Sequence, residues 1–287
     1  MIYEKNLKDE LNDLSSLKDL TQIFGEIASL RMKKIRSFVF TNRDFLQSIR
    51  NIFEEVLSSY LRKMSELVKR GKVKKDQKIT FLSHNGKIVS VFLSANTGFY
   101  GEVIKDTFKA FLEDVKAGRT EAAIIGKLGL SLFLQKEPQR PYTYFYFPDY
   151  GIDQEKLTEI IKHLVAYEEI RIFYGEYKTI ISQKPNKVII SAGTQLTDAT
   201  SIPRQEYIFE PSMEKILMFF ETEIFASTFD QSLRESQLAK FASRVIAMDE
   251  AGVKIGERIK NVDLRRLRLS HNILNKKQEN LVSYLAV

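Results

Sequence analysis

Proline is absent from both ends of the chain. All six prolines lie between Pro138 and Pro211, so residues 1–137 and 212–287 contain none. A proline inside a helix removes one hydrogen bond and clashes with the preceding turn, at about 3 kcal/mol. Both proline-free ends also carry apolar residues at steps of three and four, the spacing of one face of a helix. The sequence therefore predicts a long helix at each end.

Cysteine is missing altogether, and histidine is rare. Without cysteine the chain cannot form a disulfide, a thiolate nucleophile or a cysteine zinc site. The three histidines, His84, His163 and His271, fall in different segments without the spacing of metal ligands. Neither a GxGxxG fingerprint nor the GK[ST] ending of a P-loop is present. We therefore expect no catalytic centre, no metal site and no cofactor.

Long apolar runs are lacking as well. A transmembrane helix needs roughly 20 apolar residues, and the longest runs here are short pieces such as residues 188–190. The N-terminal segment MIYEKNLKDELNDL mixes charges with leucine and lacks the continuous apolar stretch of a signal peptide. We expect neither a transmembrane helix nor a signal peptide in this protein.

The charge balance of the chain is basic. There are 44 Lys and Arg residues against 37 Asp and Glu, a net charge of +7 and a pI near 9.2. This balance favours an acidic partner, which could be nucleic acid, a membrane surface or an acidic protein face. The aromatic residues of both ends fall on the apolar stripes and are not interleaved with the basic clusters. An acidic protein partner is therefore favoured over nucleic acid.

The apolar stripes of the two ends predict an antiparallel coiled coil. Neither stripe is stable bare in water, and the simplest arrangement is that each covers the other. Gly252 and Gly256 interrupt the second stripe at about 1 kcal/mol each relative to alanine, which indicates close contact or bending there. We divide the chain into an N-terminal coiled-coil helix over 1–70, a central domain over 71–206 and a C-terminal coiled-coil helix over 207–287.

The middle of the chain has the texture of an α/β domain. Short β-rich runs alternate with helical stretches, which indicates a Rossmann-like domain with a mainly parallel sheet. We expect strands at 78–82, 87–93, 122–126, 142–147, 170–174 and 187–191, with helices at about 101–115 and 153–167. The predicted fold class is thus α+β, with a long antiparallel coiled coil of N- and C-terminal helices and a central α/β body.

The segment SANTGFYGE, residues 94–102, follows a predicted strand and precedes a predicted helix. A glycine-rich loop at that position could cradle a phosphate. Because the P-loop ending is missing, the favoured interpretation is a tight strand-to-helix turn that uses Gly98 and Gly101.

Five motifs in order resemble the gamma subunit of F-type ATP synthases, the central rotor shaft of the F1 motor. SLKDLTQIFGEIASLRMKKIRS is similar to the family's ITKAM-x-MVA-x-x-K-x-R helix, and SANTGFYGE to its SDRGLCGG turn. IGKLGLSLF is similar to GxKGxxFF, and YKTIISQKP to F-x-S-x-x-Q-x-P. From YIFEP to the end, the chain follows the family's YLYEP segment and C-terminal helix without gaps.

The resemblance implies a non-catalytic rotor subunit. In this family the helix pair occupies a ring of alpha and beta subunits, while the α/β domain, with the epsilon subunit, sits on the membrane c-ring. Torque passes between the c-ring and the catalytic beta subunits. We therefore expect those partners, no nucleic acid, and a peripheral location at the cytoplasmic face of the cell membrane, through the c-ring only. The resemblance carries over Lys34, Arg36 and Arg244 as contacts to beta, and Tyr207 and Glu210 as the c-ring foot.

The C-terminal signature departs from the family pattern. Where the family reads NKARQAxITQE, this chain has Ser270 and His271 for the Arg-Gln pair, Asn275 for the Thr and Lys277 for the Glu. The family's Glu before Ala-Ala-Arg is Lys240. The alternatives are therefore the shaft of an F1-like ATPase repurposed away from ATP synthesis, a basic helical adaptor or nucleic-acid-binding protein, and, most remotely, an independent enzyme.

Overall fold

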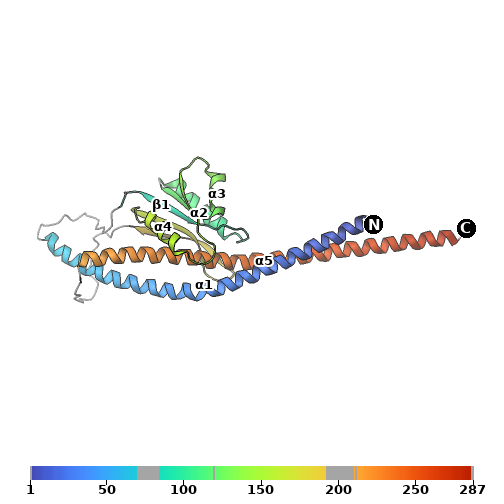
Figure 1. Cartoon of the computed structure of the whole chain (residues 1–287), viewed down its shortest axis with the longest axis horizontal. Helices are drawn as coiled ribbons and strands as arrows, with labels where there is room; N and C mark the ends of the chain where they lie inside the picture. Colours follow the sequence, from blue (N-terminus) through green and yellow to red (C-terminus); the bar gives the residue numbers. More distant parts are fainter. Residues whose placement is uncertain (1, 70–83, 119, 192–209, 211, 286–287) are drawn as a thin grey trace.

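Two long helices lie side by side and run in opposite directions (Figure 1). The structure is a computed structural model that describes residues 2–69, 84–118, 120–191, 210 and 212–285. Helix α1 spans Ile2–Lys69 and helix α5 spans Met213–Leu285. At about 1.5 Å per residue, the 73 residues of α5 extend roughly 110 Å. The predicted antiparallel helix pair is confirmed, and both termini lie at the same end of the molecule.

Contacts along the pair define its register. The pairs step steadily in opposite directions, from the ion pair Glu10–Arg258 at 2.9 Å to the ring contact Phe53–Phe220. Close approach is expected at two glycines of α5. A Cβ added at Gly252 would lie 3.5 Å from Oγ1 of Thr21, whereas nothing lies within 4 Å of Gly256. Gly252 is therefore in ordinary van der Waals contact with α1, and Gly256 is not in contact.

The central body is a five-stranded sheet in the order β3-β2-β1-β4-β5. Four strands are parallel, and the edge strand β5 pairs antiparallel with β4. The strands are β1 Ile88–Leu93, β2 Glu121–Ile125, β3 Tyr142–Phe145, β4 Glu169–Tyr177 and β5 Gln183–Ser191. The mainly parallel sheet is as predicted. The expected strand at 78–82 lies outside the described residues.

Three shorter helices connect the strands. Helices α2, Val103–Ala117, and α4, Gln154–Leu164, match the two expected helices. Helix α3, Lys127–Lys136, was not expected. It begins directly after Gly126, whose φ of +103° and close approach to the Ala95 backbone exclude a side chain. The boundary residues 70, 71, 206 and 207 lie outside the described residues, so the three-part division remains a prediction.

Each face of the sheet has its own apolar core, and α5 contributes to both. One core joins α2, α3 and the sheet to the helix pair, with Phe241 and Ala242 of α5 fully buried in it. The other core joins the opposite face to α4 and includes Phe225 and Phe229 of α5. Helix α5 therefore passes from one layer to the other beside the sheet, which positions its central turns at the carboxyl ends of the strands.

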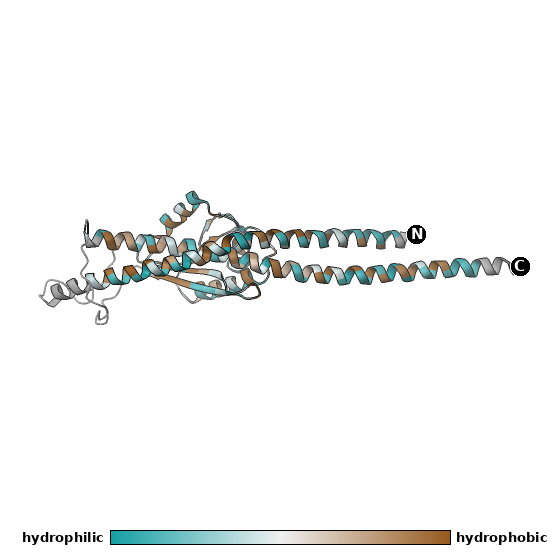
Figure 2. Cartoon of the chain, turned by 90° about the horizontal axis from the view of Figure 1, so that it is seen from below, coloured by the Kyte–Doolittle hydropathy of each residue, from teal (hydrophilic) through white to brown (hydrophobic). Residues whose placement is uncertain are grey.

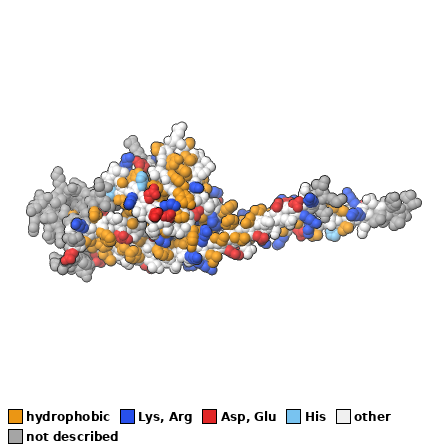
Figure 3. All heavy atoms as spheres, in the orientation of Figure 1, with side chains coloured by type: hydrophobic (Ala, Val, Ile, Leu, Met, Phe, Trp, Pro, Cys, Tyr) orange, Lys and Arg blue, Asp and Glu red, His pale blue; other side chains and the backbone are white. Residues whose placement is uncertain are grey.

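Beyond the sheet the helix pair continues alone toward the termini (Figures 1 and 2). Apolar side chains remain exposed on this part of α1: Leu17, Leu20, Ile23, Phe24, Ile27 and Leu30. Figure 3 shows hydrophobic side chains gathered where the pair leaves the sheet. No described helix has a stretch long and apolar enough to cross a lipid bilayer.

Candidate functional site: the junction between α5 and the sheet

The central turns of α5 bury polar side chains. Five of them lie on one side of the helix and are less than 9% exposed: Ser236, Gln237, Lys240, Ser243 and Arg244. Their spacing of one, three, three and one residues keeps them on neighbouring turns of one face. We call these five residues the α5 donor row. Buried polar groups require hydrogen-bond partners, so this row identifies a specific contact.

Each member of the donor row donates to a backbone carbonyl at the carboxyl edge of the sheet. Nζ of Lys240 lies 2.8 Å from the oxygen of Ser94, and Oγ of Ser243 lies 2.7 Å from that of Tyr100. The remaining bonds are Ser236 to Leu93, Gln237 to Pro148 and Gly151, and Arg244 to Gly98. Leu93 is the last residue of β1, and the other carbonyls belong to the loops that follow the strands. A backbone carbonyl in such a loop needs a partner outside the sheet ladder. Helix α5 therefore supplies the hydrogen bonds that the loops lack.

Asp149, in the loop after β3, holds the turn at residues 94–102. Its carboxylate accepts hydrogen bonds from the backbone N–H groups of Asn96, at 2.8 Å, and Thr97, at 3.1 Å. It also accepts from the hydroxyls of Thr97 and Tyr100. Those backbone N–H groups are the ones a bound phosphate would need, and a carboxylate of the chain itself occupies them. The geometry agrees with the tight turn favoured from the sequence.

Gly101 allows α5 to approach this turn closely. Its φ is +59°, a conformation that costs other residues roughly 1–2 kcal/mol. A Cβ at this position would lie 2.5 Å from Oγ of Ser243. The glycine is thus required both by the backbone turn and by the packed helix.

The two cations of the donor row lie in different surroundings. The guanidinium of Arg244 stacks over the Tyr100 ring at 3.8 Å and also reaches the Thr97 hydroxyl. The ammonium of Lys240 is buried, and its nearest carboxylate, that of Asp149, is 4.0 Å away. Burial lowers the pKa of Lys240 to about 8, with Asp149 opposing that shift and Arg244 adding to it. Burial and the negative charge of Asp149 raise the pKa of Tyr100.

A second polar cluster joins α5 to α1 on the other side of the helix. Nε of Arg43 donates to Glu235 at 2.6 Å, and the side-chain amide of Asn42 donates to Gln231 at 2.7 Å. Gln231 also donates to Glu235 at 2.7 Å. A connected buried network tolerates no other pairing of the two helices without leaving groups unpaired. It therefore specifies the register of the pair beside the sheet.

The structure separates the residues that the sequence proposed as partner contacts. Lys34 and Arg36 are exposed on α1, and the Arg36 guanidinium lies over the Phe40 ring. Arg244 is buried in the junction, where it donates to the Thr97 hydroxyl and the Gly98 carbonyl. Glu210 is exposed ahead of α5, and Tyr207 lies outside the described residues.

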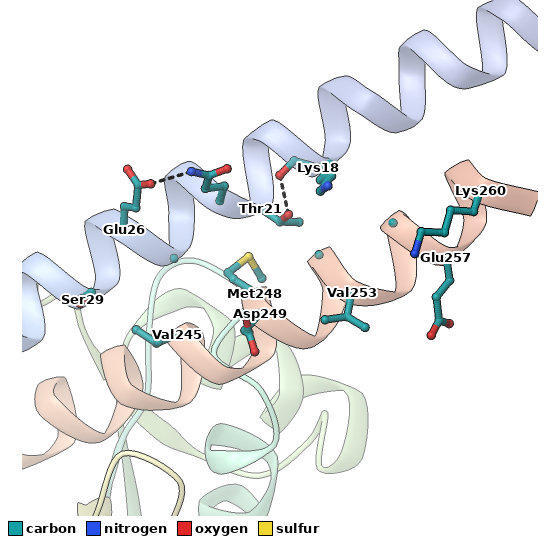
Figure 4. A pocket seen from close by; sticks show the side chains of 14 residues that line it. Lys18, Thr21, Glu26, Ser29, Val245, Met248, Asp249, Val253, Glu257 and Lys260 are labelled. Atoms are coloured by element: carbon teal, nitrogen blue, oxygen red, sulfur yellow. Dashed lines mark hydrogen bonds between the residues drawn. The ribbon is translucent and has the colours of Figure 1, made fainter. Parts of the chain in front are cut away.

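A groove separates the two helices beyond the sheet (Figure 4). Its volume is about 750 Å³. Small side chains account for much of its lining: Thr21, Gly25, Ser29, Gly252 and Gly256. Met248 and Val253 lie on its α5 side in Figure 4. The helices remain in van der Waals contact here, at Gly25 with Met248, and both of these residues line the groove.

Sequence reasoning missed the donor row. The spacing of its polar residues is also that of a solvent-facing helix stripe. Leu238 and Phe241 belong to the apolar stripe read from this end of the chain, so the sequence carried no signal that the polar face is buried as well. A helix apolar on one side and polar on the other is ordinarily half exposed, and here both sides are covered.

A long helix pair that carries a lateral α/β body, bonded to one helix by a row of hydrogen bonds, is the architecture of a shaft with a rigid side domain. A family profile described as ATP synthase matches residues 4–269, and the chain belongs to that family. The likeness to F-type gamma subunits noted from the sequence is confirmed.

Individual relatives agree with this assignment. The chain is 20% identical over 289 residues to the ATP synthase gamma chain of Desulforamulus reducens, covering 98% of both chains. It is 25% identical to that of Elusimicrobium minutum, covering 93% of both.

Solved structures share the fold. The central stalk and c-ring structure of Tetrahymena thermophila mitochondrial ATP synthase has a chain with a TM-score of 0.59 and 20% identity. That match covers 81% of this chain and 99% of the other. A chain of the Euglena gracilis mitochondrial enzyme matches with a TM-score of 0.58 and 14% identity, over 89% and 93% of the two chains.

Proposed function

We propose that this chain is the central-stalk gamma subunit of an F-type, proton- or sodium-translocating ATP synthase, transmitting torque between a membrane c-ring and catalytic beta subunits. The observation that carries the proposal is the junction. A body that receives torque must be joined to the helix pair by directional bonds, and the donor row supplies five donors from one helix face.

The subunit performs no catalysis in this proposal. Asp149 occupies the backbone N–H groups of the strand-to-helix turn, and the cations of the donor row are bound to loop carbonyls. ATP chemistry belongs to the beta subunits, and this chain changes their sites by its orientation. Membrane association is peripheral, through the c-ring, at the cytoplasmic face of the cell membrane.

The part of the helix pair that extends beyond the sheet suits the interior of an alpha–beta ring. Its exposed apolar residues, among them Leu20 and Leu30, suit a close but sliding contact, because apolar contact is not directional. Lys34 and Arg36 are exposed nearer the sheet, where acidic loops of beta are the proposed partners. Arg244 would reach beta only through the turn that it holds.

The epsilon subunit and the c-ring are the proposed partners of the sheet-bearing half. Glu210 is exposed just before α5, and with Tyr207 it forms the proposed foot. The start of α5 lies at the end of the molecule opposite the termini (Figure 1), as a foot requires if the terminal ends of both helices enter the ring.

A repurposed F1-like motor is the second candidate, favoured by the altered tip. His271, Asn275 and Lys277 are exposed near the end of α5, so they are free to meet a ring whose contacts differ from the family's usual ones.

Co-purification tests the proposed function. The full chain is expressed with the alpha, beta and epsilon subunits encoded in the same genome, and a tagged beta subunit is isolated. We expect a stable complex that contains this chain and hydrolyses ATP. A chain that stays monomeric beside a correctly assembled ring would contradict the proposal. Proton or sodium uptake by vesicles separates a synthase from a repurposed motor.

A further inference from the structure

The ammonium of Lys240 is an under-compensated charge inside the junction. Among the described residues its one close hydrogen-bond acceptor is the Ser94 carbonyl, at 2.8 Å. An ammonium has three donors, and an isolated buried charge is costly unless it is paired. The cavity beside Lys240 has a volume of about 10 Å³, room for one water molecule at most. Bulk solvent therefore does not hydrate this charge.

The charged groups around Lys240 compensate it only in part. Asp149, from the loop after β3, is 4.0 Å away, and its carboxylate already accepts four hydrogen bonds from the turn. Arg244, one turn further along α5, is a like charge. The Tyr100 ring centre lies 5.9 Å from Nζ. From α1, the Arg31 guanidinium lies over the Tyr150 and Phe241 rings.

We propose that Lys240 is the positioning residue that sets how tightly α5 is joined to the sheet, and that the joint tightens when Lys240 loses its proton. As a neutral amine it still donates to the Ser94 carbonyl. As an ammonium it places a charge in the junction that water would solvate better, so the protonated form favours opening. The mechanical consequence, a shaft joint whose stiffness depends on pH, rests on the proposed function.

The direction of the pH effect follows from proton linkage. The pKa of Lys240 is about 8 in the closed junction, against 10.5 for an unperturbed lysine. Between those two values the opened junction binds more protons than the closed one. Opening therefore becomes less favourable as the pH rises from about 8 toward 10.5. Well below pH 8 the lysine is charged in both states and the pH dependence disappears.

The bonds of the donor row matter mechanically because the neighbouring contacts are apolar. Leu238, Phe241 and Ala242 are fully buried against the body. Their attraction depends on area and not on angle, so it resists separation better than rotation. Hydrogen bonds require alignment and therefore resist rotation. Lys240 is the member of the row whose charge changes near neutral pH.

Hydrogen–deuterium exchange on the full chain tests the proposal. Protection of residues 94–101 is measured from pH 7 to 9.5 and corrected for the intrinsic pH dependence of exchange. In the wild type, opening should become about tenfold rarer between pH 8 and 9.5. Lys240→Met should abolish that dependence. Lys240→Arg, charged throughout, should open more often than the wild type at pH 9.5 and show no pH dependence.

Two further comparisons make the outcome decisive. Lys254→Met removes an exposed lysine from the same helix and should keep the wild-type profile. A flat wild-type profile, or the same dependence in Lys240→Met, would overturn the proposal. If Lys240→Met does not fold, comparing the pH profile of the wild type with that of Lys240→Arg still tests the proposal. If exchange shows no pH dependence but the chain still co-purifies with the ring, only this inference fails. If exchange shows the predicted pH dependence but the chain does not assemble with the ring, only the proposed function fails.

Discussion

Nε of Arg43 on α1 donates to Oε1 of Glu235 on α5 at 2.6 Å, and this ion pair joins the helices beside the sheet. The Glu235 side chain is 7% exposed, whereas that of Arg43 is 34% exposed. The Glu235 carboxylate has less access to water than the Arg43 guanidinium, so it loses more when the ion pair is broken. The pair lies across α5 from the donor row, so this part of α5 is held from two sides.

Removing Arg43 should destabilise the protein strongly. Arg43→Met leaves the Glu235 carboxylate buried without its cation, and we expect a loss of about 2 kcal/mol in the free energy of unfolding. Urea denaturation of the full chain measures it. Arg36→Met, at an exposed position of the same helix, should change stability by less than about 0.5 kcal/mol. Equal effects of the two substitutions would contradict the role assigned to the ion pair.

Gly101 should tolerate no side chain. Gly101→Ala combines an unfavourable positive φ with a clash against Ser243, and we expect a loss of about 2 kcal/mol. Ser243→Ala alone removes the hydrogen bond to the Tyr100 carbonyl, so it serves as the background for the comparison. In that background Gly101→Ala should cost only the part due to φ, because the clashing hydroxyl is gone. Gly98→Ala is the matched control in the same turn, because nothing lies within 4 Å of a Cβ there. Thermal unfolding compares the wild type, the three single variants and the double variant, and a Gly98→Ala loss as large as that of Gly101→Ala would refute this explanation.

The absence of cysteine allows a clean cross-link between the helices. A Cβ at Gly25 would lie 3.5 Å from Cβ of Met248, within the range of a disulfide. The pair Gly25→Cys and Met248→Cys should therefore bond on oxidation, as a mobility shift on a non-reducing gel would show. Because the two helices turn together as one shaft, the bond should leave ATP hydrolysis by the assembled complex unchanged. Loss of activity that reduction restores would mean that the helices move against each other.

Reversing the exposed charges of α1 should weaken assembly. Lys34→Glu with Arg36→Glu is expected to lower the affinity for the ring about tenfold at low salt, and less at high salt. Lys162→Glu, exposed on α4, is the control outside the proposed beta contact. Binding to an immobilised ring across a salt series measures the effect. A salt-independent loss would indicate misfolding, and no loss would remove both residues from the proposed contact.

The architecture could be predicted from the sequence because its signals are local. Proline-free stripes define the helix pair, and alternating β-rich and helical runs define the sheet. Helix α3 was not predicted because Gly129 interrupts its helical pattern. That glycine is required by a contact with a residue far away in the sequence. A Cβ at this position would lie 2.5 Å from Cβ of Ser94.

The junction could not be predicted because its evidence is not local. Lys240 and its acceptor Ser94 are 146 residues apart in the sequence. The spacing of the donor row alone indicates a solvated stripe. Only the backbone carbonyls that accept its hydrogen bonds in the folded chain show that the stripe is buried. Arg244 was singled out by resemblance, but its place in the turn follows from the fold.

Direct observation of rotation tests the central claim. Lys162→Cys places a single cysteine on α4, exposed on the sheet domain, where a probe can be attached. The complex is immobilised through its beta subunits and supplied with ATP. We predict that the probe turns continuously in one direction, because α5 and the sheet move as one body. A complex that hydrolyses ATP while the probe stays still would contradict the assignment of this chain as the shaft.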